Sequence, residues 1–265
     1  ASFAGSPCGK LAPMARIRLD RLVVERGLAA TREKARALIL AGQIRVNGQA
    51  VGKAVTLVAS DATLQLVGEP LRYVGRGGVK LEGALDDFGL DVRAKVCLDI
   101  GASTGGFTDC LLQRGARKVF ALDVGRGQLH LKLRRDPRVV VLEGINARYL
   151  KPDDIGEPDS GEPVDLVTID VAFISVEKIL PAAIACAQPG SDLLILVKPQ
   201  FELRRRQVGK GGIVRDPGLQ QQAVDKVARA AQQLGLEVLG VRESHLPGAE
   251  GNREFFLHAR VKTLR

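Results

Sequence analysis

Short apolar runs alternate with amphipathic stretches from about residue 95 to the end of the chain. Runs such as KVCLDIGA (95–102) and DLLILVKP (192–199) are typical of strands buried on both faces of a parallel sheet. Helices are predicted over GGFTDCLLQRG (105–115), SVEKILPAAIACA (175–187) and GLQQQAVDKVARAAQQLG (218–235). This alternation predicts an α/β fold, in which helices cover both faces of an open, mostly parallel sheet.

The region from residue 14 to about 73 has a different pattern. A helical period places Leu19, Leu22 and Val23 on one face, and a second short helix follows after Gly27. The Asn47-Gly48 pair, flanked by alternating apolar and polar residues, is the strongest short-range signal for a β-hairpin. These features predict a small α+β domain.

Four segments follow from these patterns. Residues 1–13 have neither a helical nor a strand period, and we interpret them as a tag or disordered tail. Residues 14–73 form the small domain, and the glycine-rich residues 74–79 are predicted as an interdomain linker. Residues 80–265 form the α/β domain.

Composition adds a positive charge to this picture. The chain has 39 Lys and Arg residues against 30 Asp and Glu residues, and 45% hydrophobic residues can supply real cores. The segment from Met14 to Arg72 contains ten basic and only five acidic residues. Arg32 and Arg36 lie four positions apart on one predicted helix. The charge favours a polyanionic partner, with nucleic acid as the leading candidate, although a solvated helix face would have the same composition.

The small domain resembles a known RNA-binding fold. The resemblance is carried by residues 18–51, RLDRLVVERGLAATREKARALILAGQIRVNGQAV. Like the S4-like domain, this segment has a helix, then a helix with an R-x-x-A sequence, then a G-x-V-x-V-N-G hairpin, in which Ile44 occupies the first valine position. The resemblance implies that structured RNA is the ligand, read by its shape and backbone. The candidate RNA-binding residues are Arg16, Arg18, Arg32, Lys34, Arg36 and Arg45 in this domain, Arg76 in the linker, and Arg204, Arg205 and Arg206 in a later loop.

Polar residues at successive strand ends of the α/β domain point to a nucleoside ligand. LDIGASTGGFTD has a D-x-G-x-x-x-G-G pattern, without the spacing of a dinucleotide site. Asp123, at the next strand end, is placed to accept both hydroxyls of a ribose, and Asn146 follows at the third. S-adenosylmethionine is therefore the expected cofactor. The expected cofactor-binding residues are Asp99, Gly101, Ser103, Thr104, Gly105, Gly106, Phe107, Asp123, Asn146 and Asp170.

The fourth and fifth strand ends bear on what is methylated. IDVAFIS lacks the D/N-P-P-Y sequence typical of amine methylation, and no cysteine nucleophile lies at a neighbouring strand end. Lys198 instead follows an apolar run in LVKPQFE, where it could act as a base or steer a hydroxyl. A simple surface charge at a strand end is the alternative.

Seven motifs together resemble one family: YVGRGGVKL, LDIGASTGGFTDCLL, ALDVGRGQL, DVAFIS, VKPQFE, GKGGIVRDP and GNREFF. They are similar to the TlyA family of ribosomal RNA 2′-O-methyltransferases, relatives of the FtsJ-type enzymes. The resemblance implies a Rossmann-like class I methyltransferase with a mostly parallel seven-stranded sheet, preceded by the S4-like domain. It also implies a catalytic tetrad of Lys80, Asp170, Lys198 and Glu254.

The resemblance extends to the substrate. Family members modify cytidines in 23S rRNA, and members with extra length at both ends also modify 16S rRNA. The short segments before the first helix and after the last strand favour the 23S-only type. The expected partners are ribosomal RNA or ribosomal subunits. Arg204, Arg205 and Arg206 depart from the FEVGKGQVG sequence usual in the family.

Two other hypotheses about function stay open. A noncatalytic RNA-binding ribosome-assembly factor would keep the same fold, and the family name carries a haemolysin or pore-forming role. The chain has no run of about 18 uncharged apolar residues, which is the length that a membrane-spanning helix needs. The four cysteines and three histidines show no metal-ligand spacing, so no metal is expected, and a reducing cytoplasm fits the cysteine usage.

Overall fold

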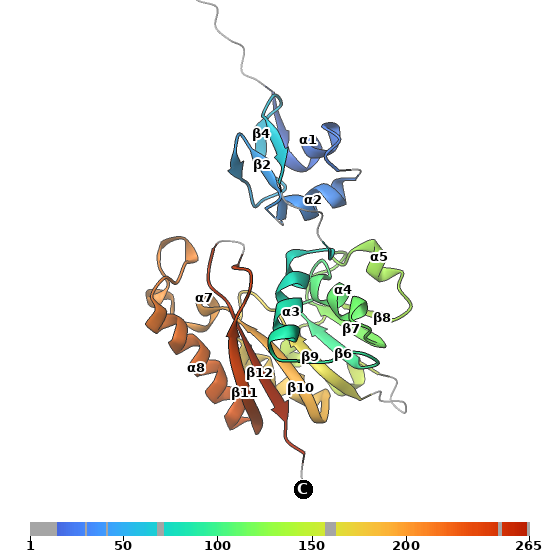
Figure 1. The fold of residues 1–265 in the computed structure, drawn as a ribbon, viewed down its shortest axis with the longest axis vertical. Coiled ribbons are helices and arrows are strands. Elements are labelled where there is room, and N and C mark those ends of the chain that lie inside the picture. The colour runs from blue at the N-terminus through green and yellow to red at the C-terminus, as the bar shows by residue number, and fades with distance from the viewer. Residues whose placement is uncertain are drawn as a thin grey trace, which may run out of the picture. The chain divides into compact units, whose positions relative to one another are not determined.

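The computed structural model describes residues 15–29, 31–40, 42–67, 72–156, 163–248 and 251–263. The chain divides into two compact units, Ala1–Glu69 and Pro70–Arg265 (Figure 1). The expected tail at residues 1–13 lies outside the described residues.

The N-terminal unit combines two helices with short antiparallel strands. Its elements are β1 (Arg16–Arg18), α1 (Leu19–Glu25), α2 (Arg32–Leu40), β2 (Ile44–Val46), β3 (Gln49–Ala50), β4 (Leu57–Ala59) and β5 (Leu64–Leu66). Strand β1 pairs with β4, and β2 pairs with both β3 and β5. The apolar faces of both helices are buried in one core with β2 and β4.

The hairpin in this unit is confirmed at the predicted turn. Asn47 and Gly48 have φ values of 49° and 80°, and Val46 pairs with Gln49 across the turn. Positive φ at both central positions matches the twist of the flanking strands, which explains why this dipeptide favours a hairpin.

A mostly parallel seven-stranded sheet forms the centre of the second unit, as predicted. Its strands are β6 (Val96–Ile100), β7 (Lys118–Asp123), β8 (Val139–Glu143), β9 (Val164–Ile169), β10 (Ala187–Val197), β11 (Leu236–Glu243) and β12 (Phe255–Val261). They lie in the order β11-β12-β10-β9-β6-β7-β8, and β12 runs antiparallel to both its neighbours. The parallel strands β6, β7, β9 and β10 therefore end at one edge of the sheet.

Helices cover both faces of this sheet (Figure 1). On one side, α3 (Arg76–Asp87), α4 (Gly106–Gln113) and α5 (Leu131–Arg134) pack on residues such as Cys97 of β6. On the other, α6 (Leu180–Ala185) and α8 (Pro217–Gln233) pack on residues such as Leu98. Successive side chains of a strand point to opposite faces, so apolar residues at consecutive positions supply both cores.

The helix predicted over residues 175–187 is interrupted. A 3-10 turn, η3 (Val176–Lys178), precedes the short α6, and Pro181 lies at the start of α6. Proline lacks an N–H group and is tolerated only in the first turn of a helix, so a single continuous helix was the wrong prediction.

The predicted linker at residues 74–79 is also largely helical, because α3 already begins at Arg76. Its glycines allow α3 and α4 to pack closely against each other. A Cβ atom on Gly106 of α4 would lie 3.0 Å from the Gly78 nitrogen and 3.2 Å from the Gly77 Cα. Backbone therefore packs on backbone where α3 meets α4, a contact that larger residues would prevent.

Candidate active site

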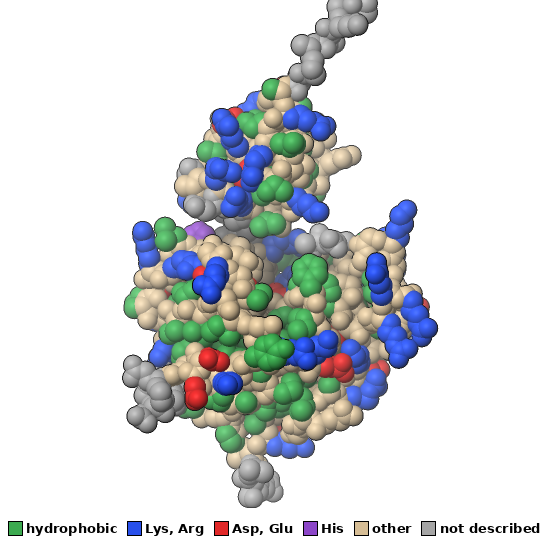
Figure 2. All heavy atoms as spheres, turned by 180° about the vertical axis from the view of Figure 1, so that it is seen from behind, with side chains coloured by type: hydrophobic (Ala, Val, Ile, Leu, Met, Phe, Trp, Pro, Cys, Tyr) green, Lys and Arg blue, Asp and Glu red, His purple; other side chains and the backbone are tan. Residues whose placement is uncertain are grey.

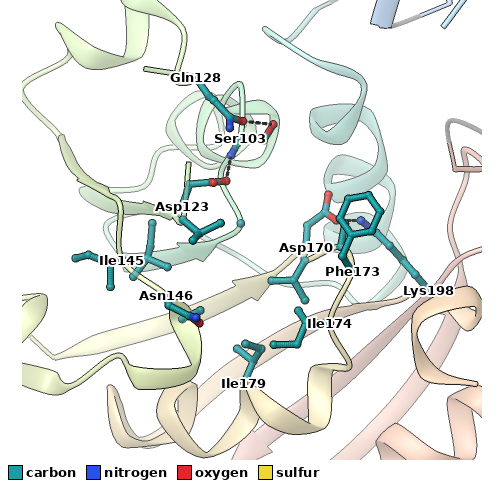
Figure 3. Close-up of a pocket in the computed structure, with 16 residues that line it drawn as sticks. Ser103, Asp123, Gln128, Ile145, Asn146, Asp170, Phe173, Ile174, Ile179 and Lys198 are labelled. Carbon is teal, nitrogen blue, oxygen red and sulfur yellow. Dashed lines mark hydrogen bonds and ion pairs between the residues drawn. The ribbon is translucent and has the colours of Figure 1, made fainter. Parts of the chain in front are cut away.

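A cavity of about 550 Å³ opens at the carboxyl ends of the parallel strands (Figure 3). Ligands of open α/β sheets bind at this edge. Of the residues predicted from sequence, the cavity is lined by Gly101, Ser103, Asp123, Asn146, Asp170 and Lys198. The strand ends thus bring together residues that are up to about a hundred positions apart in the chain.

The turn after β6 forms one wall of this cavity. Gly101 has a φ of 88°, and a Cβ atom there would lie 2.2 Å from the Asp170 carbonyl oxygen. Gly105, with a φ of 98°, caps α4 and faces Leu133 so closely that a Cβ atom would lie 2.1 Å from its Cδ1. Only glycine allows both the left-handed backbone and the close approach.

The Asp123 carboxylate, at the end of β7, is held by two backbone amides. The Ser103 N–H donates to Oδ2 at 2.8 Å, and the Gly125 N–H donates to Oδ1 at 2.7 Å. Each carboxylate oxygen can accept a further hydrogen bond, so the oriented carboxylate suits a pair of vicinal hydroxyls.

Apolar side chains complete the cavity beside Asp123. It is also lined by five residues that were not predicted from sequence: Val124, Ile145, Ala147, Ile174 and Ile179. Two of them could have been found from the sequence, because each is adjacent to a predicted site residue: Val124 follows Asp123, and Ile145 precedes Asn146. Apolar walls around a few fixed polar groups are typical of sites that bind a small molecule or cofactor.

A smaller hollow of about 130 Å³ shares Gly101, Ser103 and Asp170 with the main cavity. It is lined by the predicted cofactor residues Thr104, Gly106 and Phe107, and by the start of α3. Arg76, predicted to bind RNA, lies here, and its Nη2 donates to the Pro247 carbonyl at 2.9 Å. In the structure Arg76 therefore anchors the segment between β11 and β12.

Asp99 and Gly105 line neither hollow. Asp99 is completely buried and accepts hydrogen bonds from the Thr108 hydroxyl at 2.6 Å and the Thr168 hydroxyl at 3.1 Å. It joins α4 and β9 to β6 beneath the glycine turn.

Burial raises the pKa of Asp99 to about 7, while the threonine hydrogen bonds act in the opposite direction. A carboxyl group with a raised folded-state pKa stabilises the fold fully below its unfolded pKa of about 4. That contribution is lost as the pH rises from about 4 through about 7. We expect Asp99→Asn, which cannot ionise, to gain about 5 °C or more in Tm relative to wild type between pH 5 and pH 8. Parallel Tm profiles of the two proteins would contradict this assignment.

Lys198 and Asp170 form an ion pair at the edge of the cavity. Asp170 follows β9 and Lys198 follows β10, and these strands pair in parallel with Ile195 opposite Ile169. Adjacent strand ends thus deliver an amine and a carboxylate to one place. Both side chains remain partly accessible, at 14% for Lys198 and 23% for Asp170.

Phe173, which was not predicted from sequence, lies beside this pair in Figure 3. It is 92% exposed and has a φ of 65°, a rare conformation for a bulky residue. Its ring centroid is 5.2 Å from that of Phe201. Residues with a strained backbone cluster at active and ligand sites, where the surrounding structure holds the strained conformation in place.

Glu202 joins the two loops that carry these residues. It is buried in α7 (Pro199–Glu202), and its carboxylate accepts from the Val176 N–H at 2.8 Å and the Ser175 hydroxyl at 2.6 Å. Lys226 of α8 donates to its carbonyl at 2.9 Å. The loop after β9 is thereby fixed to the loop after β10, a contact that no local pattern could predict.

Lys80 and Glu254 form a second ion pair, and both residues are buried. Lys80 lies in α3, and Glu254 immediately precedes β12. Neither residue lines the main cavity. The structure thus arranges the four expected catalytic residues as two ion pairs, one of them at the cavity.

The remaining RNA-binding candidates are on the surface. Figure 2 shows Lys and Arg side chains gathered over the N-terminal unit and at several places on the second. Arg18, Arg32 and Arg36 share a single partner, Asp20. The exposed candidates are Arg16, Arg32, Lys34, Arg36, Arg45, Arg204, Arg205 and Arg206.

Within the parts of the chain that the structure describes, no helix combines the length and apolar character needed to cross a membrane. In the same parts, His, Cys, Asp and Glu side chains form no group of three or more that could hold a metal ion.

Comparison with known proteins shows the family of this chain. The family model of FtsJ-like methyltransferases matches residues 73–261, and that of the S4 domain matches residues 17–62. A Mycobacterium tuberculosis protein named 16S/23S rRNA (cytidine-2′-O)-methyltransferase TlyA is 50% identical over 94% of this chain and 92% of its own length. The chain belongs to the TlyA family of FtsJ-like methyltransferases.

Other members of the TlyA family carry a different name. Hemolysin A of Brachyspira hyodysenteriae is 40% identical over 91% of this chain and 99% of its own length. A solved structure of a protein described as a hemolysin, from Streptococcus thermophilus, has a TM-score of 0.74 and 42% identity, and it covers 94% of this chain and 90% of that one. The protein from Streptococcus thermophilus thus shares the fold of this chain, in which the S4 domain precedes the FtsJ-like methyltransferase domain.

Proposed function

We propose that this protein transfers a methyl group from S-adenosylmethionine to the ribose 2′-oxygen of a cytidine in ribosomal RNA. The observation that carries the proposal is the Lys198–Asp170 ion pair, placed at the edge of a cavity that also holds the Asp123 carboxylate. The rRNA cytidine specificity in the name of the Mycobacterium tuberculosis relative supports the choice of substrate. A ribosomal substrate would place the enzyme in the cytoplasm.

The cavity residues fit S-adenosylmethionine. We assign the ribose hydroxyls of the cofactor to Asp123, and its adenine to the space between Val124, Ile145 and Asn146. The glycine turn at Gly101 would let the backbone approach the rest of the molecule. When bound, the cofactor supplies an electrophilic methyl group on a sulfonium ion.

The residues of the two ion pairs then have distinct tasks. The Lys198 ammonium donates a hydrogen bond that holds the 2′-hydroxyl with a lone pair in the direction of attack, or, after giving up its own proton, the lysine amine accepts the hydroxyl proton. Asp170 orients the lysine. Lys80 is buried against Glu254 and does not line the cavity, so its side chain would contact the target hydroxyl or the adjacent phosphate only after turning toward the cavity. Most of the rate enhancement would come from positioning, since the methyl donor is already reactive.

Phe173 provides a place for the target nucleobase. An exposed ring next to Asp170 and Lys198 can stack on a base whose ribose has been brought to the reacting groups. We expect Phe173→Ala to reduce kcat/KM for RNA by about 5-fold to 100-fold, the usual worth of one stacked base. S-adenosylmethionine affinity is expected to stay unchanged, and Phe173→Tyr should keep most of the activity. Equal kcat/KM for the alanine variant and wild type would remove Phe173 from the site.

The experiment that tests the proposal is methyl transfer to separated, unmodified 30S and 50S subunits and to their free rRNAs, with labelled S-adenosylmethionine. Label in either rRNA supports the proposal and decides between 16S and 23S substrates. If cofactor binding is normal and neither RNA is labelled, the proposal fails, and a noncatalytic binding role takes its place. Leakage from liposomes incubated with the pure protein would instead support the activity in the relatives' hemolysin names.

A further inference from the structure

A fully buried aspartate lies under three arginines in the N-terminal unit. Asp20, in the first turn of α1, has no exposed surface. Arg18 donates to both of its oxygens at 3.0 Å and 2.9 Å, Arg32 donates to Oδ2 at 3.0 Å, and Arg36 donates to Oδ2 at 3.3 Å. One carboxylate thus holds guanidinium groups from the end of β1 and from α2.

Burying a carboxylate in a small domain carries a desolvation cost, and an apolar residue often stabilises such a position better. The hydrogen bonds from Arg18, followed by those from Arg32 and Arg36, hold the pKa of Asp20 far below its usual range, so the group stays ionised. The arginine side chains are still 40%, 54% and 51% exposed. The charge is buried, while the groups that it orders face solvent.

The three guanidinium groups keep donors for a ligand. Each has five N–H groups, and Asp20 occupies at most two of them on any one arginine. Without a shared acceptor, three neighbouring cations would repel one another and lose rotamer entropy on binding. With Asp20, their planes are fixed before a ligand arrives, and planar guanidinium groups suit the bidentate recognition of phosphate.

We propose that Asp20 is a positioning residue, which sets Arg18, Arg32 and Arg36 as a preformed site for phosphodiester groups of the RNA backbone. The proposal rests on the RNA substrate proposed above. It makes a prediction whose sign is opposite to that of simple charge counting. Removing a negative charge should strengthen RNA binding by electrostatics alone, whereas loss of the common acceptor should weaken it.

The first test measures the Kd of full-length unmodified 23S rRNA for the intact protein carrying Asp20→Asn. We expect affinity to fall about tenfold, in line with the loss of charge-assisted hydrogen bonds. The matched control is Glu25→Gln, which removes one exposed carboxylate from the same helix and should leave affinity equal or slightly higher. Affinity of a folded Asp20→Asn protein equal to or above that of wild type would overturn the proposal.

A second pair of variants keeps the test valid if Asp20→Asn fails to fold. Arg32→Lys and Arg36→Lys retain the charge but lose the planar fork, so each should bind RNA about threefold to tenfold more weakly, with an unchanged salt dependence. Arg21→Lys, at an exposed ion pair on α1, is the control and should bind as wild type does. If both lysine variants also bind as wild type does, the proposal is wrong. If wild type itself does not bind the RNA, the proposed function fails instead.

Discussion

Lys198→Ala is expected to lower the rate of methyl transfer about 10²-fold to 10⁴-fold, the usual contribution of a positioned acid–base group. The lysine is the cationic member of the ion pair at the cavity edge, and Asp170 fixes its amine beside the space where a ribose would enter. S-adenosylmethionine affinity should change little, because Asp123 and the apolar walls bind the cofactor in our proposal. Single-turnover rates and calorimetric cofactor binding measure the two effects separately.

Lys178→Ala is the matched control, because Lys178 is an exposed lysine in η3 outside the cavity lining. It should transfer methyl groups at the wild-type rate. A Lys198→Ala protein with an unchanged single-turnover rate would exclude Lys198 from the reaction. An effect confined to KM would show that the lysine binds RNA and takes no part in the chemical step.

Gly101→Ala is expected to damage both the cofactor site and the fold. A Cβ atom would lie 2.2 Å from the Asp170 carbonyl oxygen, which belongs to backbone that cannot swing aside as a side chain can. The turn after β6 and the end of β9 must therefore separate. We expect S-adenosylmethionine affinity to fall about 10-fold to 100-fold, as for roughly 1–3 kcal/mol of overpacking. Tm should fall by several degrees.

Gly235→Ala separates this clash from backbone strain. Gly235 has a φ of 86°, close to the 88° of Gly101, and nothing lies within 4 Å of its added Cβ atom. Its alanine variant should show a smaller drop in Tm and unchanged cofactor affinity. Equal losses of cofactor affinity in the two variants would show that the contact with Asp170 is unimportant.

The parts of the fold that could be predicted from sequence depend on local patterns. The buried strands were evident because both faces of a parallel strand are apolar, as Cys97 and Leu98 show on opposite faces of β6. The hairpin followed from the backbone preference of Asn47-Gly48. Asp123 and Lys198 could be selected because parallel strands end at one edge, where polar residues after apolar runs must gather.

Contacts between distant segments account for what was missed. Glu202 reaches Ser175 and Val176, and no periodicity marks a buried carboxylate that ties two loops together. Similarly, the glycines before Lys80 suggested an interdomain linker, and their contact with the backbone of α4 could not be read from the sequence. Asp20 is another example, since composition counted its three arginines as a charged surface but gave no sign of their common buried partner.

Chemical identification of the methylated nucleoside tests the central claim most directly. Unmodified rRNA would be labelled with the methyl group of S-adenosylmethionine by wild-type protein and by Lys198→Ala, then digested to nucleosides and analysed by mass spectrometry. We predict that wild type labels the ribose of cytidine, in a form that protects the neighbouring phosphodiester from alkaline hydrolysis, and that Lys198→Ala loses this label. Label on a base would contradict the proposed reaction, as would ribose label of equal amount with the Lys198→Ala protein.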